Sequence, residues 1–175
     1  MKTHPSSDKD LETMGEAYRE LLEGALRKAR QGGSSLFHWL GGHGHDDPQH
    51  DVDQKGHEVA ELERYVRRDL ADSARYRHET GRDLHDWLGF DVALIEQTFW
   101  NIFSDAADQT LLAAHEMRLQ AEVSEYHTGE MVGLGTLACD KCNERLHFSA
   151  VARIPPCPRC GGTHFHRAVD GPPLA

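Results

Sequence analysis

The stretch CDKCNERLHFSAVARIPPCPRCG, residues 139–161, carries all four cysteines of this 175-residue chain. Their pattern is C-x2-C-x14-C-x2-C, the spacing of two paired-cysteine turns that converge on one tetrahedral ion. Asn143 and Gly161 directly follow the two pairs, and both residue types readily adopt the positive φ that such a turn needs. The sequence therefore predicts one structural zinc ion with four thiolate ligands, namely Cys139, Cys142, Cys157 and Cys160.

Two other uses of the cysteines stay open. Disulfides would need an oxidising compartment, whereas the N-terminal MKTHPSSDKD contains no apolar segment like that of a secretory leader. Iron can occupy the same four-sulfur cage, as in rubredoxin-like domains. We expect a cytoplasmic chain that binds zinc rather than iron and has no membrane segment.

Short strand-like segments surround the cysteines, at Leu134–Ala138, Arg145–Val151 and Thr163–Val169. Residues 131–175 are near the size below which an apolar core alone seldom suffices. Metal binding contributes about 10–16 kcal/mol to folding in such small modules. We therefore predict a C-terminal zinc ribbon over residues 131–175, folded by its metal.

Residues 1–130 have the composition of an acidic helical region. Thr13 and Glu16 form a candidate capping box for the first helix, and Gly32 with Gly33 ends it. The three helices that we expect to follow are Asp53–His78, Asp83–Phe103 and Asp105–Glu125.

A narrow apolar seam follows the second of these helices. It consists of Val59, Leu62, Val66, Leu70 and Ala74, which recur at helical spacing. The pattern predicts an elongated antiparallel helical hairpin or small bundle with coiled-coil character. The seam either closes within the chain or pairs two chains into a homo-oligomer. The fold class is therefore α+β, with the helices before the β ribbon.

Several histidines lie outside the predicted ligand set. The segment GGHGHDDPQHD, residues 41–51, contains His43, His45 and His50 and is expected to be a flexible loop. Weak binding of a transition metal by these histidines is the alternative. Four thiolates already complete a tetrahedral site, so we expect the histidines near the cysteines to be surface or supporting groups: His147, His164 and His166.

The two halves of the chain differ in charge. Residues 1–130 hold 14 Lys and Arg against 26 Asp and Glu, whereas residues 131–175 hold 5 against 3. Four thiolates on one zinc ion add about −2, so the ribbon is close to neutral. Contacts to phosphate need a dense basic face. The charge therefore disfavours nucleic acid and favours another protein as the partner, with a weak nucleic-acid contact as an alternative.

The sequence offers no catalytic motif. It contains no G-x-x-x-x-G-K-[ST], G-x-G-x-x-G or G-x-S-x-G, and no cysteine beyond the four predicted ligands. A rubrerythrin-like redox protein would need Glu-x-x-His pairs on its helices. The chain has this spacing once, from Glu144 to His147, inside the predicted ribbon. We therefore expect that the chain is not an enzyme, with an iron redox protein as the alternative.

Three glycines separate the helices from the ribbon: Gly129, Gly133 and Gly135. We interpret them as turn residues that start the first strand of the ribbon, because glycine serves turns more often than switches. A hinge that reorients the ribbon is the other interpretation.

Four segments give the chain a family resemblance. YHTGEMVGLGTLACDKC (residues 126–142) and CPRCGGTHFHR (157–167) resemble the YbeL-like zinc-ribbon family of bacteria, as do RRDLADSARYR (67–77) and TFWNIFSDAADQT (98–110). The resemblance implies a cytoplasmic bacterial protein with an N-terminal helical region and a C-terminal zinc ribbon. It implies the metal role for all four cysteines and no particular activity. Together with the residue patterns, it predicts a zinc-binding, non-catalytic protein-interaction or regulatory module.

Overall fold

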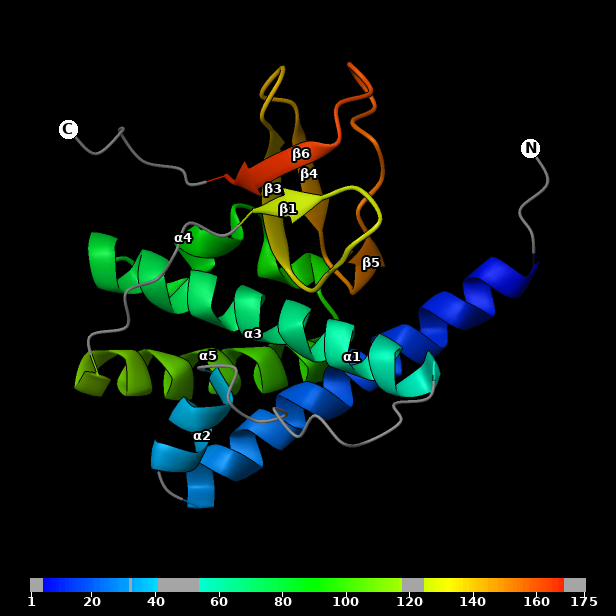
Figure 1. Ribbon diagram of the computed structural model, residues 1–175. Coiled ribbons are helices and arrows are strands. Elements are labelled where there is room, and N and C mark those ends of the chain that lie inside the picture. Colours follow the sequence, from blue (N-terminus) through cyan, green and yellow to red (C-terminus); the bar gives the residue numbers. More distant parts are fainter. Residues whose placement is uncertain (1–4, 32, 41–53, 118–124, 169–175) are drawn as a thin grey trace.

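A computed structural model describes residues 5–31, 33–40, 54–117 and 125–168. The helices lie together on one side of the molecule, and a small antiparallel sheet stands on them (Figure 1). The chain is therefore α+β, as predicted. The helical elements are α1 (Pro5–Gln31), α2 (Gly33–Leu40), α3 (Gln54–Thr80), α4 (Leu84–Leu88), the 3-10 turn η1 (Val92–Leu94) and α5 (Gln97–Met117).

The first helix is longer than predicted. Helix α1 begins at Pro5, so the capping box at Thr13 and Glu16 is wrong. The Thr13 hydroxyl instead donates to the Lys9 carbonyl oxygen one turn earlier, at 2.9 Å, inside the helix. The end of α1 at Gln31 agrees with the glycine stop, and α3 agrees closely with the predicted second helix.

The predicted third and fourth helices are wrong in their boundaries. The break lies between α4 and α5 rather than at Asp105, which is an exposed residue within α5. Gly89 ends α4 with φ 78°, a left-handed conformation that suits glycine. The Glu96 carboxylate then accepts hydrogen bonds from the backbone N–H groups of Thr98 and Phe99 and so starts α5. Residues 118–124 of the predicted fourth helix lie outside the described residues.

The sheet has the antiparallel strand order β1-β6-β3-β4, and a separate pair joins β2 to β5. The strands are β1 (Tyr126–His127), β2 (Met131–Val132), β3 (Gly135–Cys139), β4 (Arg145–Phe148), β5 (Ala152–Arg153) and β6 (His164–Arg167). Because β1 pairs with β6, the sheet includes residues before the predicted boundary at 130. The division of the chain into two domains stays a prediction.

Two apolar clusters form the interior. The larger one joins the helices, with Leu62, Val66 and Leu70 of the predicted seam buried against residues such as Leu22 and Phe103. The smaller one lies within the sheet and includes the cysteines together with Phe148 and Phe165. Met131 and Leu134 belong to the helical cluster although they lie in or beside the sheet. The sheet is therefore packed on the helices by apolar contact.

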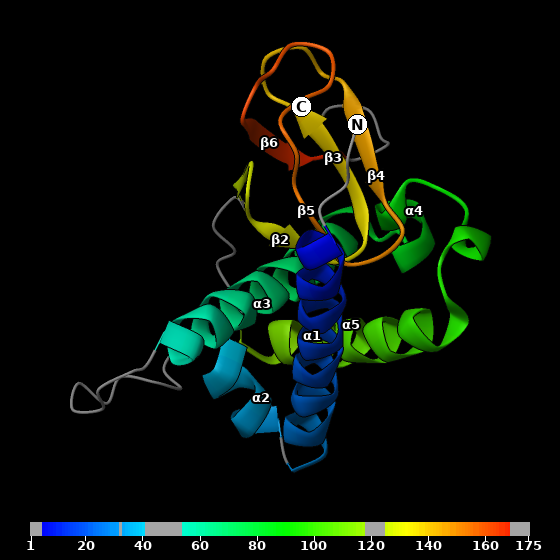
Figure 2. The same cartoon turned by 90° about the vertical axis from the view of Figure 1, so that its right-hand side faces the viewer.

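None of the described helices has the length and apolar composition needed to cross a membrane. Figure 2 shows α1 upright beneath the sheet, and α3 and α5 cross α1.

Candidate metal centre

Each cysteine pair is held by a tight backbone turn. The backbone N–H of Asn143 donates to the Cys139 carbonyl at 2.8 Å, and that of Gly161 donates to the Cys157 carbonyl at the same distance. Asn143 has φ 59° and Gly161 has φ 69°, which confirms the predicted positive φ after each pair. The two turns are therefore alike in conformation as well as in spacing.

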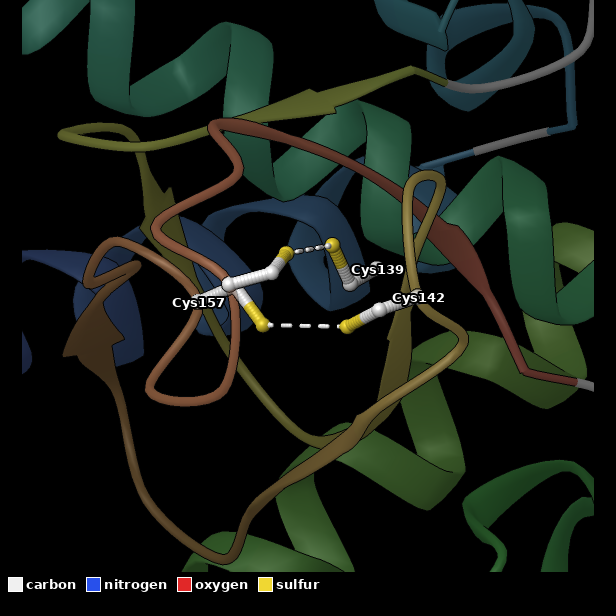
Figure 3. Close-up of side chains that lie close together, drawn as sticks. Cys139, Cys142 and Cys157 are labelled. Carbon is white, nitrogen blue, oxygen red and sulfur yellow. Dashed lines mark hydrogen bonds between the residues drawn. The ribbon is translucent and has the colours of Figure 1, made fainter.

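The four sulfur atoms converge on one point (Figure 3). All four Sγ atoms lie within 4.8 Å of one another. Between the two turns, the Sγ atoms of Cys139 and Cys160 are 3.6 Å apart, as are those of Cys142 and Cys157. Four sulfurs at about 2.3 Å from one ion in tetrahedral geometry are about 3.8 Å apart. The cysteines are free thiols at ligand spacing, far beyond the roughly 2.05 Å of a disulfide bond. The donor set and its spacing fit zinc.

Four thiols this close cannot all carry charge without a cation. The backbone N–H of Glu144 lowers the pKa of Cys142, but desolvation and hydrogen bonds with the other cysteines raise it to about 12. Burial raises the pKa of Cys157, but the backbone N–H groups of Cys160 and Arg159 and the neighbouring thiols lower it to about 7. The Cys157 thiol thus loses its proton at a lower pH than the Cys142 thiol, as expected where neighbouring thiolates repel one another. A divalent ion removes this conflict.

Gly162 allows the second turn to approach the metal ligands closely. A Cβ atom on Gly162 would lie 2.9 Å from Cys139 Sγ and 3.3 Å from Cys160 Sγ, too close for a carbon atom beside sulfur. Glycine at this position therefore permits the convergence of the four sulfurs.

The ribbon histidines do not join the cysteines. In the described ranges, the four cysteines are the only group of three or more His, Cys, Asp and Glu side chains at metal-ligand spacing. His166 Nδ1 lies 2.6 Å from Asp140 Oδ1, and His147 Nδ1 lies 2.8 Å from Thr136 Oγ1. Thr136 donates its hydroxyl proton to the Leu88 carbonyl, so His147 is the donor in the second contact. His43, His45 and His50 lie outside the described residues.

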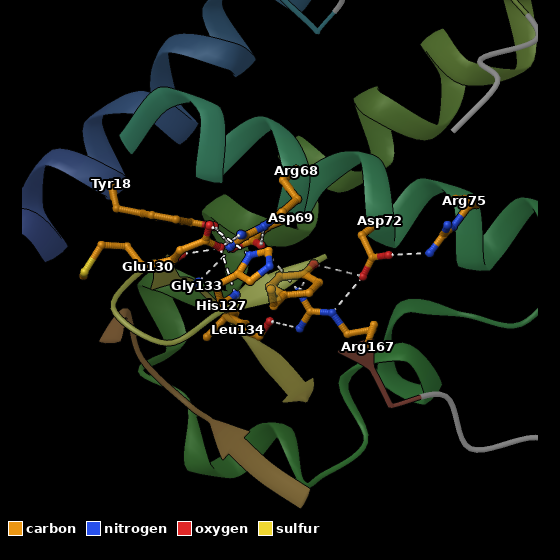
Figure 4. A network of polar contacts seen from close by, with 12 residues as sticks. Tyr18, Arg68, Asp69, Asp72, Arg75, His127, Glu130, Gly133, Leu134 and Arg167 are labelled. Carbon is orange, nitrogen blue, oxygen red and sulfur yellow. Dashed lines mark hydrogen bonds and ion pairs between the residues drawn. The ribbon is translucent and has the colours of Figure 1, made fainter. Parts of the chain in front are cut away.

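A second feature connects the ribbon to the helices: a buried polar network around Arg167 (Figure 4). The Arg167 guanidinium donates to Asp72 Oδ2 at 2.7 Å, to the Tyr126 hydroxyl at 2.7 Å and to the Leu134 carbonyl at 2.9 Å. It also lies over the ring of Trp87, at 4.5 Å from the ring centroid. Arg167 thus joins strand β6 to helix α3 from a position that is almost completely buried.

Asp69 is the second anchor of this network. Its Oδ2 accepts the Tyr18 hydroxyl at 2.7 Å and the Gly133 backbone N–H at 2.8 Å, while Arg167 and Arg68 approach Oδ1 at 3.5 Å. A Cβ atom on Gly133 would collide with the Tyr18 ring and hydroxyl. Glycine at 133 therefore lets the backbone reach Asp69. The positive φ values of Gly129 (94°) and Gly135 (117°) support the interpretation of those two junction glycines as turn residues.

Burial and neighbouring charges both shift the pKa values of the network residues. Burial raises the pKa of Tyr18, and the neighbouring Asp69 carboxylate raises it further, so Tyr18 stays a hydrogen-bond donor. Burial lowers the pKa of Arg167, but Tyr126, Asp72 and Asp69 together raise it above its usual value. Arg167 is therefore a permanent cation whose charge the two buried carboxylates balance.

Sequence reasoning missed this network, although two signals were available. Asp69 lies three residues after Val66 on the apolar seam of α3, where a carboxylate must be buried with a partner. Arg167 lies two residues after the buried Phe165 in a strand, so the two side chains point to the same face. The segments that carry the family resemblance include Arg68, Asp69 and Asp72 in one, Tyr126 and Gly133 in a second and Arg167 in a third, whereas Tyr18 lies outside them.

Comparison with known proteins agrees with this geometry. The family model described as a zinc-ribbon containing domain matches residues 24–169. The uncharacterized protein YbeL of Escherichia coli strain K12 is 36% identical over 111 residues, which cover 63% of this chain and 68% of YbeL. The YbeL proteins of E. coli O6:H1 strain CFT073 and of E. coli O157:H7 match with the same identity and coverage. No solved structure matches the chain. Because the matched region includes the four cysteines and most of the helices, the chain belongs to the zinc-ribbon containing domain family.

Proposed function

We propose that the chain is a non-catalytic zinc protein whose ribbon, fixed on the helical body, recognises another protein. The observation that carries this proposal is the convergence of four cysteine sulfurs within 4.8 Å of one another. When bound, zinc would supply a tetrahedral cross-link between the two cysteine turns. With four protein ligands the ion keeps no coordination position for a substrate or for water, unlike catalytic sites with three.

The charges of the ribbon support a protein as the partner. Of its five basic residues, Arg167 is buried and Arg153 donates to the Gly129 carbonyl. Lys141, Arg145 and Arg159 are exposed in or next to the cysteine turns, and Arg159 lies 3.8 Å from Glu144. So few exposed cations beside an acidic body make a poor phosphate-binding face, but they suit a small acidic patch on a protein.

Free thiols at ligand spacing also suit a reducing compartment, which supports the cytoplasm as the location. Immunodetection of the chain in fractionated cells tests this part of the proposal, and recovery from an oxidising compartment would contradict it.

Metal analysis of protein purified without added metal tests the site. We expect one zinc per chain, and none after replacement of Cys157 by Ser. One iron per chain with a red colour would instead indicate an electron-transfer protein, because the same four thiolates also accept iron.

The partner class is tested by a photo-crosslinking residue placed at the exposed position of Lys141, with the exposed Asp86 of α4 as the control position. We expect adducts at position 141 that protease digests and nuclease leaves intact. The variant Arg159→Glu should not form these adducts. Adducts removed by nuclease, with yields that fall steeply as salt rises, would overturn the choice of a protein partner. Equal adducts at both positions would contradict recognition through the ribbon.

A further inference from the structure

The helical body carries a concave surface away from the metal centre. A groove of about 510 Å³ lies between α1, α2 and α3, which are seen together in Figure 2. Its apolar lining includes Ala17 and Leu21 of α1, Trp39 of α2, and Val59 and Leu62 of α3. Trp39 and Leu62 are buried at the floor of the groove, Ala17 and Leu21 are half-buried, and Val59 is exposed at its edge.

Val59 shows that the predicted apolar seam does not close completely within the chain. Leu62, Val66, Leu70 and Ala74 are buried, whereas Val59 is 52% exposed and faces the groove. The part of the seam left open is therefore the part that lines this surface.

The charges along α1 reverse at the middle of the groove. Glu20 and Glu23 precede Gly24, whereas Arg27, Lys28 and Arg30 follow it. Within the described ranges, no ion pair involves any of these five side chains, and Lys28 lies over the ring of Trp39, with its Nζ 5.7 Å from the ring centroid. A helix that is acidic before one point and basic after it is complementary to an antiparallel copy of itself.

Gly24 lies at the centre of this reversal. Ala17, Leu21, Gly24 and Lys28 line the groove at spacings of four, three and four residues, which place them on one stripe of α1. A Cβ atom on Gly24 would have one neighbour within 4 Å, the Nη2 atom of its own Arg27 at 3.7 Å. The backbone of α1 is thus approachable from outside at this point.

We propose that the groove is the dimer interface of the protein and that a second copy occupies it, with the two α1 helices antiparallel about a two-fold axis at Gly24. Glu20 and Lys28 are each four residues from Gly24, so Glu20 of each copy faces Lys28 of the other. Leu21 and the aliphatic stem of Arg27 are likewise equidistant and face each other across the interface. Each copy supplies both halves of every contact, as an isologous interface requires.

Light scattering and sedimentation of the full zinc-loaded chain over a range of concentrations test the dimer. We expect the molar mass of two chains for the wild type at high concentration. Glu20→Lys and Lys28→Glu should each give the mass of one chain. The double variant Glu20→Lys with Lys28→Glu should restore the dimer, because each copy again offers opposite charges. Glu12→Lys is the matched control, since Glu12 is an exposed α1 residue outside the groove lining, and it should leave the dimer intact.

Gly24→Leu provides a second test that does not change charge. The added side chain has space within the monomer but fills the axis of the dimer, so this variant should have the mass of one chain with unchanged helical circular dichroism and zinc content. A wild type with the mass of one chain at every concentration would overturn the proposal. A double charge swap that stays monomeric, or a Gly24→Leu variant that still dimerises, would also overturn it. If the wild type stays monomeric and its groove binds an unrelated helical protein, the groove is the site of another partner and the dimer proposal is wrong.

Discussion

Arg167 is the residue through which the metal-binding part and the helical part of the chain meet. It follows Cys160 by seven residues, yet its guanidinium contacts Asp72 on α3, Tyr126 on β1 and the Leu134 carbonyl. A buried cation is tolerated because two buried carboxylates, Asp69 and Asp72, balance it. Removal of one partner leaves the others charged and out of contact with water.

We expect Arg167→Met to destabilise the protein by about 3–5 kcal/mol, because it removes one side of a buried ion pair while keeping the length of the side chain. Arg159→Met is the control: its partner Glu144 is 3.8 Å away in an exposed pair, so the loss should stay below about 1 kcal/mol. Chemical denaturation of the zinc-loaded proteins, followed by circular dichroism, measures both values. Equal effects of the two variants would contradict the role assigned to Arg167.

Among the elements, helix α5 shows how one side chain decides where a helix starts. Glu96 precedes the helix, and its two carboxylate oxygens accept the N–H groups of Thr98 and Phe99 at 2.8 and 2.9 Å. These hydrogen bonds lower the pKa of Glu96, since they favour the charged form. Glu96 also lies 3.1 Å from Arg19 of α1, so this helix start touches the first helix.

The lowered pKa makes the contribution of Glu96 dependent on pH. A carboxylate with a lowered folded-state pKa stabilises the protein above its unfolded pKa, about 4.3, and this stabilisation is lost as the pH falls through the folded value. We therefore expect Glu96→Gln to lower Tm at pH 7 and the difference from wild type to shrink in acid. Thermal melts of both proteins at several pH values measure it. Glu12→Gln, an exposed substitution inside α1 and away from its start, should show no such trend.

At the scale of the whole molecule, the ribbon and the helical body form one connected unit. The Gly133 N–H donates to Asp69, Arg167 donates to Asp72, and Thr136 donates to the carbonyl of Leu88, the last residue of α4. These three contacts come from different parts of the ribbon and reach two helices. The ribbon is therefore held in one orientation, and a metal ion bound by the four cysteines would also hold partners of the buried carboxylates in place.

Removal of zinc should therefore weaken the helices as well as the ribbon. A chelator should unfold residues around the cysteines first, and the loss of Arg167 and Gly133 as partners should leave Asp69 and Asp72 without their counter-groups. We expect a lower Tm for the helical signal at 222 nm, restored when zinc is returned. A chelator already saturated with zinc serves as the control. Helices that melt at the same temperature with and without metal would show that the two parts are energetically independent.

The sequence by itself determined the metal centre, because cysteine spacing and the residue after each pair act over a few neighbouring positions. Asn143 and Gly161 adopt the expected conformation, and the helix α3 followed from apolar periodicity alone. The start of α5 could not be placed in this way, since the Glu96 cap and the Gly89 stop override a continuous apolar pattern. Only the tertiary structure decided that Asp69, Asp72 and Arg167 meet, because their approach depends on β6 pairing beside β1 and β3 and on the sheet packing over α3. These contacts join residues nearly a hundred positions apart and depend on that packing. Patterns among neighbouring residues do not determine which distant segments pack together.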